Sequence, residues 1–377
     1  MEKKIEIAEN IKFLEKSAIR KIVEAAPANS VNFGLGEIQF PPPRYLIDHA
    51  KQILDSKLLG YTHNAGLLEL RECICNYYNT EFNNNVCVSN GAEEALFATF
   101  FSYLNPDDEV IIADPTFLAY RTIAEMLGAK IVAFDLDAAS NFSLNKISFQ
   151  KAFSKKTKLV VLNNPSNPTG TCFGKDEIDL IVKTCAEKKV LLVVDEVYRE
   201  LFIEERPESF FSHKADVICI SSLSKSHCLS GWRLGWAISN QPELIEPIIK
   251  VHQYLSTCAP TLSQEIALKA FSKTGMEESE KIRQQLLTNR KIVLDYLAGI
   301  NILPNKSLPY LFVQVEVNDV KFAYELAKKG AIVIPGSAFG ANAYGWIRLN
   351  CGIEKNSFLR GLKILRSYLS FIYLIDN

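Results

Sequence analysis

The sequence lacks several features that mark whole classes of protein. No apolar run is long enough to cross a membrane, and the charged first stretch, "MEKKIEIAENIKFLEK", has no apolar signal core. The formal net charge is only -1, so no charge excess favours nucleic acid or an acidic membrane as a partner. We therefore expect a cytoplasmic protein that binds neither nucleic acid nor membrane.

The cysteines also exclude some possibilities. There are nine, without a C-x-x-C pair or the spacing of a metal site, and Cys73 and Cys75 are the closest two. An odd and dispersed set is typical of reduced thiols packed in a cytosolic interior, so we expect no metal. Internal repeats and low-complexity linkers are missing as well, which excludes solenoids and long disordered spacers.

The 377 residues that are present alternate between apolar β-branched runs and helical segments. This alternation predicts an α/β fold with a three-layer, mostly parallel central sheet and a smaller α+β domain. The large domain is predicted at residues 41–274, and the small domain at residues 1–40 and 275–377. Residues 31–43 are predicted as a loop. Helices are predicted near residues 8–26, 43–58, 66–80, 117–127 and 262–298.

Chemically useful groups follow four of the apolar runs. "VCVSN" ends at Gly91 and Ala92, which open a helix whose free N–H groups suit a phosphate, although an ordinary turn explains them equally well. "NPSNPTG" supplies Asn167 within a proline-rich turn. "VVDEVY" supplies Asp195, which a helix cap or an ion pair would also explain. "SSLSKSHCLSGWRLGW" supplies Lys225, which alone would be an exposed turn lysine.

The fourth run adds groups that bind anions. Ser222 and Ser224 flank the lysine, and Arg233 offers a planar fork of donors suited to phosphate. Pyridoxal phosphate (PLP) requires this combination: a lysine for a Schiff base, an acid at its pyridine nitrogen and a phosphate cup. The sequence therefore predicts PLP as cofactor, with the lysine as general acid–base.

At these motifs the chain resembles the class I/II PLP-dependent aminotransferases of fold type I, in the aspartate and aromatic aminotransferase branch. "NPSNPTG", "VVDEVY", "SLSKSHCLSGWRLGW" and "WIRLNCG" follow the order and spacing of that family. The resemblance extends from "SAIRKI" to "GLKIL". It implies an aminotransferase (EC 2.6.1.-) that moves an amino group between an L-amino acid and a 2-oxo acid, as a homodimer with shared active sites.

The resemblance also implies a role for each matching position. Lys225 would form the internal aldimine, Asp195 would pair with the pyridine nitrogen, and Tyr198 would hold the ring's phenolic oxygen together with Asn167. Arg348 would bind the substrate α-carboxylate, supported by the Gly36 backbone and Asn167. The remaining cofactor contacts are implied for Gly91, Ala92, Phe117, Ser222, Ser224, Arg233 and, reaching across to the partner's site, Tyr61.

Two departures leave the substrate open. The family's "GEPDF" reads "GEIQF" here, and its "GAFY" reads "SLPY" at residues 307–310. A PLP-dependent lyase or cyclase on the same scaffold is therefore an alternative. A regulator that joins this domain to a DNA-binding module is another, against which the lack of a basic patch argues. His227 and Cys228 follow the lysine, either as proton carriers or as packing beneath the cofactor, and we favour packing.

Overall fold

A seven-stranded sheet forms the centre of the computed structural model, which describes residues 5–375 apart from 13, 15–17, 214 and 316. Only β8 runs antiparallel to its neighbours, so the prediction of a mostly parallel sheet is confirmed. In spatial order the strands are β2 (Val86–Ser89), β8 (Gly235–Ile238), β7 (Val217–Ser222), β6 (Leu191–Asp195), β5 (Thr157–Asn163), β3 (Glu109–Asp114) and β4 (Lys130–Asp135).

Alternate residues of these strands enter two separate cores. Val110 and Ile112 of β3 belong to the core beneath α4, α5 and α8, whereas Ile111 belongs to the core on the other face, beneath α2, α3, α7 and α9. Successive side chains of a strand point to opposite faces, so helices cover both sides and the sheet is the middle of three layers. These helices are α2 (Arg44–Ser56), α3 (Leu68–Tyr77), α4 (Ala92–Tyr103), α5 (Leu118–Met126), α6 (Lys146–Lys151), α7 (Lys175–Lys188), α8 (Pro242–Ser256) and α9 (Thr261–Ala270).

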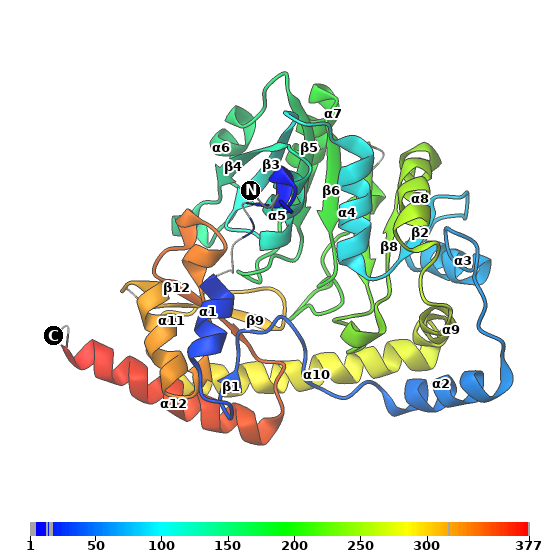
Figure 1. The fold of residues 1–377 in the computed structure, drawn as a ribbon. Coiled ribbons are helices and arrows are strands. Elements are labelled where there is room, and N and C mark those ends of the chain that lie inside the picture. Colours follow the sequence, from blue (N-terminus) through cyan, green and yellow to red (C-terminus); the bar gives the residue numbers. More distant parts are fainter. Residues whose placement is uncertain (1–4, 13, 15–17, 214, 316, 376–377) are drawn as a thin grey trace.

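A third core joins the two ends of the described chain. It packs Phe33 and Ile38 against Phe358 and Leu362, around a three-stranded antiparallel sheet ordered β11-β12-β9 and a parallel pair, β1 with β10. Figure 1 shows these elements gathered below the central sheet. The residue boundaries of the two domains stay a prediction. The elements are α1 (Ala18–Ala25), β1 (Val31–Asn32), α10 (Lys273–Tyr296), β9 (Tyr310–Gln314), α11 (Asp319–Lys328), β10 (Ala331–Ile332), β11 (Ile334–Pro335), β12 (Trp346–Asn350) and α12 (Lys355–Ile375).

Two predicted helices differ from the structure. Residues 8–26 hold a short 3-10 helix (Glu9–Ile11) and α1, with residues 13 and 15–17 outside the described residues. The single helix predicted over residues 262–298 is two helices, α9 and α10, because Ser272 caps the second by accepting a hydrogen bond from the Gly275 N–H at 3.2 Å. Within the described part of the chain, no helix is both long and apolar enough to cross a bilayer.

Candidate active site

A cavity of about 380 Å³ opens at the carboxyl ends of three neighbouring strands. Asn163, Asp195 and Ser222 are the last residues of β5, β6 and β7, and all three line it. Ligands of open α/β sheets bind at this edge. The cavity also contains most of the predicted site residues, namely Gly36, Ala92, Phe117, Asn167, Tyr198, Ser224, Lys225, Arg233 and Arg348.

Lys225 reaches into the cavity from the turn that follows β7. Its Nζ donates a hydrogen bond to the Gly36 carbonyl and lies 5.9 Å from the centre of the Tyr198 ring. The lysine is half-buried, and no carboxylate of the described residues forms an ion pair with it. Its Nζ is therefore held by a backbone carbonyl rather than by an ion pair.

Asp195 is buried at the base of the cavity. Burial raises the pKa of its carboxyl to about 6, although hydrogen bonds from the Tyr120 hydroxyl (2.8 Å) and the Val197 N–H (3.1 Å) act in the opposite direction. Tyr120 was not predicted as a site residue. It lies one helical turn after Phe117, and the two rings meet edge-on with their centroids 5.6 Å apart. The sequence separation of three residues from Phe117 was the only signal that could have indicated Tyr120.

The start of α4 and Arg233 form a cationic corner of the cavity. Gly91 precedes the helix with φ of 86°, a left-handed conformation that glycine adopts readily. A Cβ there would lie 2.5 Å from Nη2 of Arg233. Arg233 itself donates to the carbonyls of Ser230 (2.9 Å) and Asn90 (3.1 Å), which fixes its guanidinium beside the free N–H groups of the helix.

A half-buried acid, Glu94, supports this corner from behind. Glu94 accepts hydrogen bonds from the Asn90 N–H (2.7 Å), the Asn90 side-chain amide and the Ser256 hydroxyl (2.8 Å), and it also contacts His252 Nδ1 at 2.7 Å. Burial acts to raise the pKa of Glu94, but these hydrogen bonds and the histidine outweigh it and lower the pKa to about 2. The prediction missed this network because Glu94 and His252 lie 158 residues apart.

Arg348 is buried between two aromatic rings on the opposite wall. Its guanidinium carbon lies 4.3 Å from the centre of the Tyr310 ring and 4.7 Å from that of Phe339. Nη1 donates to Asn167 Oδ1 and Nη2 to the Gly34 carbonyl, both at 2.6 Å. Nε has no partner among the described residues although it is buried. An unsatisfied buried donor of this kind is suited to an anionic ligand.

Tyr198 and Tyr310 join the two walls. Their hydroxyl oxygens are 2.8 Å apart, and burial raises the pKa of Tyr198, so Tyr198 is a neutral hydrogen-bonding group at neutral pH. Tyr310 also explains why residue 36 is a glycine, since a Cβ at Gly36 would lie 2.9 Å from the Tyr310 hydroxyl. Tyr310 ends the variant "SLPY" motif and was not predicted as a site residue.

Four residues singled out in the sequence lie outside the cavity lining: Gly91, which precedes α4, and Tyr61, His227 and Cys228. Tyr61 is 88% exposed. His227 is buried, its Nδ1 lies 2.9 Å from the Ser226 hydroxyl, and burial lowers its pKa to about 4. Burial raises the pKa of Cys228 to about 12. Neither His227 nor Cys228 lines the cavity, which agrees with packing rather than proton transfer.

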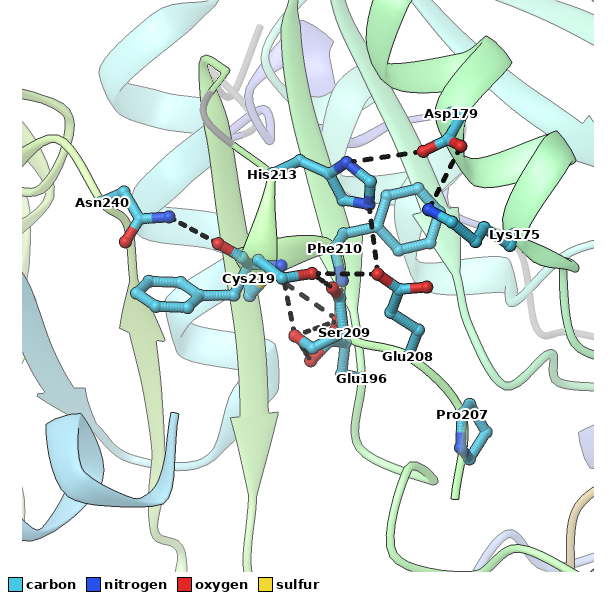
Figure 2. Close-up of polar contacts among 12 residues, drawn as sticks. Lys175, Asp179, Glu196, Pro207, Glu208, Ser209, Phe210, His213, Cys219 and Asn240 are labelled. Atoms are coloured by element: carbon cyan, nitrogen blue, oxygen red, sulfur yellow. Dashed lines mark hydrogen bonds and ion pairs between the residues drawn. The ribbon is translucent and has the colours of Figure 1, made fainter. Parts of the chain in front are cut away.

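Glu196, the neighbour of Asp195, faces a different set of partners. Figure 2 shows it beside Ser209 and Cys219. It accepts hydrogen bonds from the Ser209 hydroxyl at 2.9 and 2.8 Å and from the Phe210 N–H at 2.8 Å. This buried acid anchors the loop over residues 207–213 to the sheet. The two adjacent acids of "VVDEVY" therefore have separate tasks, one at the cavity and one in the scaffold.

Comparison with known proteins identifies the family. Residues 28–364 match the family model described as aminotransferase class I and II. The chain belongs to this family. Both the expected family and the expected enzyme class are thereby confirmed, and the relatives' names favour transamination over the lyase or cyclase alternative.

Relatives of this aminotransferase carry different substrate names. A probable aspartate aminotransferase from Methanocaldococcus jannaschii is 31% identical, over 96% of this chain and 99% of its own. A probable N-acetyl-LL-diaminopimelate aminotransferase from Bacillus subtilis is 30% identical, over 94% of each. The structure of an aromatic aminotransferase from Pyrococcus horikoshii matches with a TM-score of 0.87 and 27% identity, over 94% of this chain and 100% of the other.

The residues of this aminotransferase fit the PLP on which its family depends. The unpaired Nε of Arg348 suits a substrate carboxylate, and the corner beside Arg233 is kept open by glycine. At Gly235 a Cβ would lie 2.4 Å from the Ala92 N, so a side chain there would distort the helix start. The described residues contain no group of three or more His, Cys, Asp or Glu side chains that could hold a metal ion.

Proposed function

We propose that this aminotransferase binds PLP on Lys225 and transfers an amino group between an L-amino acid and a 2-oxo acid. The observation that carries the proposal is the content of one cavity. Among the described residues, it combines a lysine that forms no ion pair, a buried acid and a helix start beside Arg233 with a buried arginine whose Nε has no partner. Each group has a matching part in the cofactor or the substrate.

The cofactor would be held at three points. Arg233, Ser222, Ser224 and the N–H groups at the start of α4 would bind the phosphate. Asp195 would accept a hydrogen bond from the pyridine nitrogen, and Phe117 would pack against the ring. Tyr198 and Asn167 would contact the phenolic oxygen, the first through its hydroxyl and the second through its side-chain amide.

When bound, PLP supplies an electron sink that stabilises the negative charge left at the substrate α-carbon. The protein's share of the reaction is binding, orientation and proton transfer. Arg348 would grip the α-carboxylate and so orient the α-hydrogen toward Lys225. Lys225 Nζ would take this proton and return it, as a general acid–base. Asp195 would keep the pyridine nitrogen protonated, because a carboxylate beside it favours the cationic form.

A homodimer is the assembly that we propose, in the cytoplasm. Tyr61 is 88% exposed, and two further apolar side chains, Leu58 at 99% and Tyr254 at 89%, are exposed as well. Large apolar side chains left in contact with water are typical of surfaces that a partner covers. Tyr61 would contact the phosphate bound in the partner's cavity.

The experiment that tests the reaction follows the cofactor spectrum. After reconstitution with PLP, the protein should absorb visible light, and borohydride should fix the cofactor to the peptide that contains Lys225. With a reactive amino acid alone, it should convert once, stoichiometrically, to the aminated cofactor and stop until a 2-oxo acid is added. Lys225→Ala serves as the control: borohydride should not fix the cofactor to it, and an amino acid should not convert its cofactor to the aminated form. Continuous turnover of one amino acid without an acceptor would instead indicate a lyase or cyclase.

A further inference from the structure

The loop between β11 and β12 carries Phe339, whose ring covers one face of the Arg348 guanidinium at 4.7 Å. Phe339 is buried, and both residues line the cavity. The first part of the loop is anchored to α11, because the Ser337 N–H donates to the Asp319 carboxylate at 2.7 Å. The position of the Phe339 ring therefore depends on what holds the rest of the loop.

An acid of the central sheet holds the second part of the loop. Asp114 is the last residue of β3, and its carboxylate accepts hydrogen bonds from the N–H groups of Ala341 (3.0 Å) and Asn342 (3.1 Å). These residues begin a 3-10 helix, Ala341–Ala343, whose N-cap is Gly340 and offers no side chain for capping. Asp114 therefore caps this helix, although Asn342 lies 228 residues away in the sequence.

Further contacts join the same two segments. The Asn342 side-chain amide donates to the Asp114 carbonyl at 3.1 Å, and the Thr116 N–H donates to the Phe339 carbonyl at 3.0 Å. A Cβ at Gly340 would lie 1.9 Å from Asp114 Oδ1, so any other residue there would push the carboxylate and the loop apart. The end of β3 and the turn after it therefore fix both Phe339 and the residues that follow it.

These contacts lie between two segments that supply aromatic rings to the cavity. Phe117, which we expect to pack against the cofactor ring, directly follows Thr116, and Phe339 covers the arginine that we expect to bind the α-carboxylate. A hydrogen bond between charged groups is stronger where water is excluded. Movement of the loop would expose the Arg348 guanidinium to water and weaken its bond to a carboxylate.

We propose that Asp114 is a positioning residue for substrate binding: by capping the helix at residues 341–343, it holds Phe339 over Arg348. The inference rests on the proposed function, since it takes Arg348 as the α-carboxylate site. Loss of the cap should leave cofactor binding intact. Other hydrogen bonds hold the groups expected to contact the cofactor, namely Asp195, Lys225 and Arg233.

The first test compares Asp114→Ala with the wild type in half-reactions of the PLP-bound enzyme. The amino acid is the most reactive one of a panel. Its half-saturating concentration should rise at least about tenfold, because two hydrogen bonds to a carboxylate are lost. The limiting rate should stay within about threefold and the visible spectrum should not change, because the reacting groups are untouched. Asp114→Asn keeps one acceptor oxygen and should lie between the two proteins.

A second substitution shows whether Asp114 acts through the ring. In a Phe339→Ala background, Asp114→Ala should raise the half-saturating concentration less than about twofold, because the ring that it positions is already gone. Gly340→Ala disturbs the same contact from the side of the helix and should reproduce the effect of Asp114→Ala. It also decides the question if Asp114→Ala does not fold.

The matched control is Asp137→Ala. Asp137 also caps a 3-10 helix, by accepting from the N–H groups of Ala139 (3.1 Å) and Ser140 (3.3 Å), but it lies outside the cavity lining. The half-saturating concentration should be that of the wild type in this control.

Two further readouts do not depend on turnover. Butyrate, a carboxylate without an amino group, should raise the Tm of the PLP-bound wild type more than that of Asp114→Ala. In the cofactor-free protein, hydrogen exchange at the N–H groups of Ala341 and Asn342 should be faster in Asp114→Ala than in the wild type, because both have lost their acceptor.

The outcomes separate this inference from the proposed function. A lower Tm of Asp114→Ala with an unchanged half-saturating concentration would assign Asp114 a structural role only and overturn the inference. The same increase in the wild-type and Phe339→Ala backgrounds would overturn it too, because Asp114 would not act through the ring. Both results leave the aminotransferase intact. If no amino acid of a wide panel converts the cofactor spectrum of the wild type, the proposed function itself fails.

Discussion

Arg348 shows how one side chain serves two walls of the cavity. Its Nη1 and Nη2 bind Asn167 and the Gly34 carbonyl, and two aromatic rings cover its faces. The ring contacts exclude water, and exclusion of water strengthens a charge-assisted hydrogen bond. What remains is a rigid guanidinium whose Nε has no partner among the described residues and whose Nη1 and Nη2 each keep a second N–H.

Arg348→Lys should weaken amino-acid reactivity strongly while leaving the visible spectrum of the bound cofactor intact. A lysine cannot reproduce the planar fork, and losing one partner of a buried charge pair costs about 2–5 kcal/mol. Half-reaction kinetics give the change in kcat/KM. Arg121→Lys, at an exposed site, is the control and should behave as the wild type does. An unchanged kcat/KM in Arg348→Lys would remove the assignment.

Asp195 makes the stability of the cofactor-free protein depend on pH. Burial raises its pKa from 3.8 to about 6 in the folded protein, so the folded state holds a proton that the unfolded state has released. Stability is therefore highest below pH 3.8 as far as this group is concerned; it falls as pH rises from 3.8 to about 6 and levels off above that. A shift of this size corresponds to a loss on the order of 3 kcal/mol.

Asp195→Asn should remove that loss, so the cofactor-free variant should be more stable than wild type above pH 6 and should lose cofactor-dependent activity. Urea unfolding of both proteins between pH 4 and 8 provides the measurement. Asp55→Asn, an exposed acid on α2, should leave the pH profile of the wild type unchanged. Identical pH profiles for Asp195→Asn and wild type would show that burial does not perturb this acid.

The start of α4 is the element on which the cationic corner depends. Glu94, in its first turn, is anchored by His252 and Ser256 of α8 and holds the Asn90 N–H. The Asn90 carbonyl in turn accepts from Arg233. A helix from a distant part of the chain therefore positions the corner that would hold the phosphate.

Glu94→Gln should destabilise the protein and weaken PLP binding together. Hydrogen bonds to a charged group contribute about 1.5–3 kcal/mol, and an amide in place of the carboxylate retains only part of them. Because the folded pKa of Glu94 is lowered to about 2 from 4.5, its contribution is present above pH 4.5 and is lost as pH falls toward 2. Urea unfolding at pH 7 and at pH 3, with a PLP titration, tests this.

Glu246→Gln is the matched control for this prediction, since Glu246 lies on α8 but is exposed and pairs with Lys250. It should change neither stability nor PLP affinity noticeably. A Glu94→Gln protein with wild-type stability and wild-type PLP affinity would contradict the supporting role of the network.

At the scale of the whole molecule, the cavity is built from segments far apart in the sequence. Gly34–Glu37 come from the N-terminal segment, Lys225 from the central sheet, and Tyr310 and Arg348 from the C-terminal sheet. The third hydrophobic core, which packs the two ends of the described chain together, brings these segments to one place. Tyr61 does not belong to this set of segments, because its side chain is exposed on the surface of the chain.

Mixing Tyr61→Phe subunits with Lys225→Ala subunits should restore part of the activity. If each cavity takes Tyr61 from its partner, one site of the heterodimer carries both changes and the other carries none. Activity is measured after subunit exchange has been demonstrated by mass spectrometry. Background activity despite complete exchange would show that the sites are not shared.

Several site residues could be predicted because their signal is local. Lys225 and Asp195 each follow a buried apolar run, and a charged group at such a strand end stands out against its neighbours. Tyr120, Tyr310 and Glu94 could not be predicted in this way. Tyr120 is an aromatic residue in an amphipathic helix and Tyr310 one in an apolar strand, and ordinary packing explains both. Glu94 is an acid in a first helical turn, which ordinary helix capping explains.

The sequence by itself determined the order of strands and helices, the mostly parallel sheet and the identity of the groups at its carboxyl edge. Those features depend on periodicity and on which residue follows which, and both are local. The tertiary structure alone decided which groups face one another: Arg348 with Asn167, Tyr198 with Tyr310, and Glu94 with His252. Contacts between residues more than a hundred positions apart arise only when the cores close, so their geometry follows from packing rather than from any local pattern.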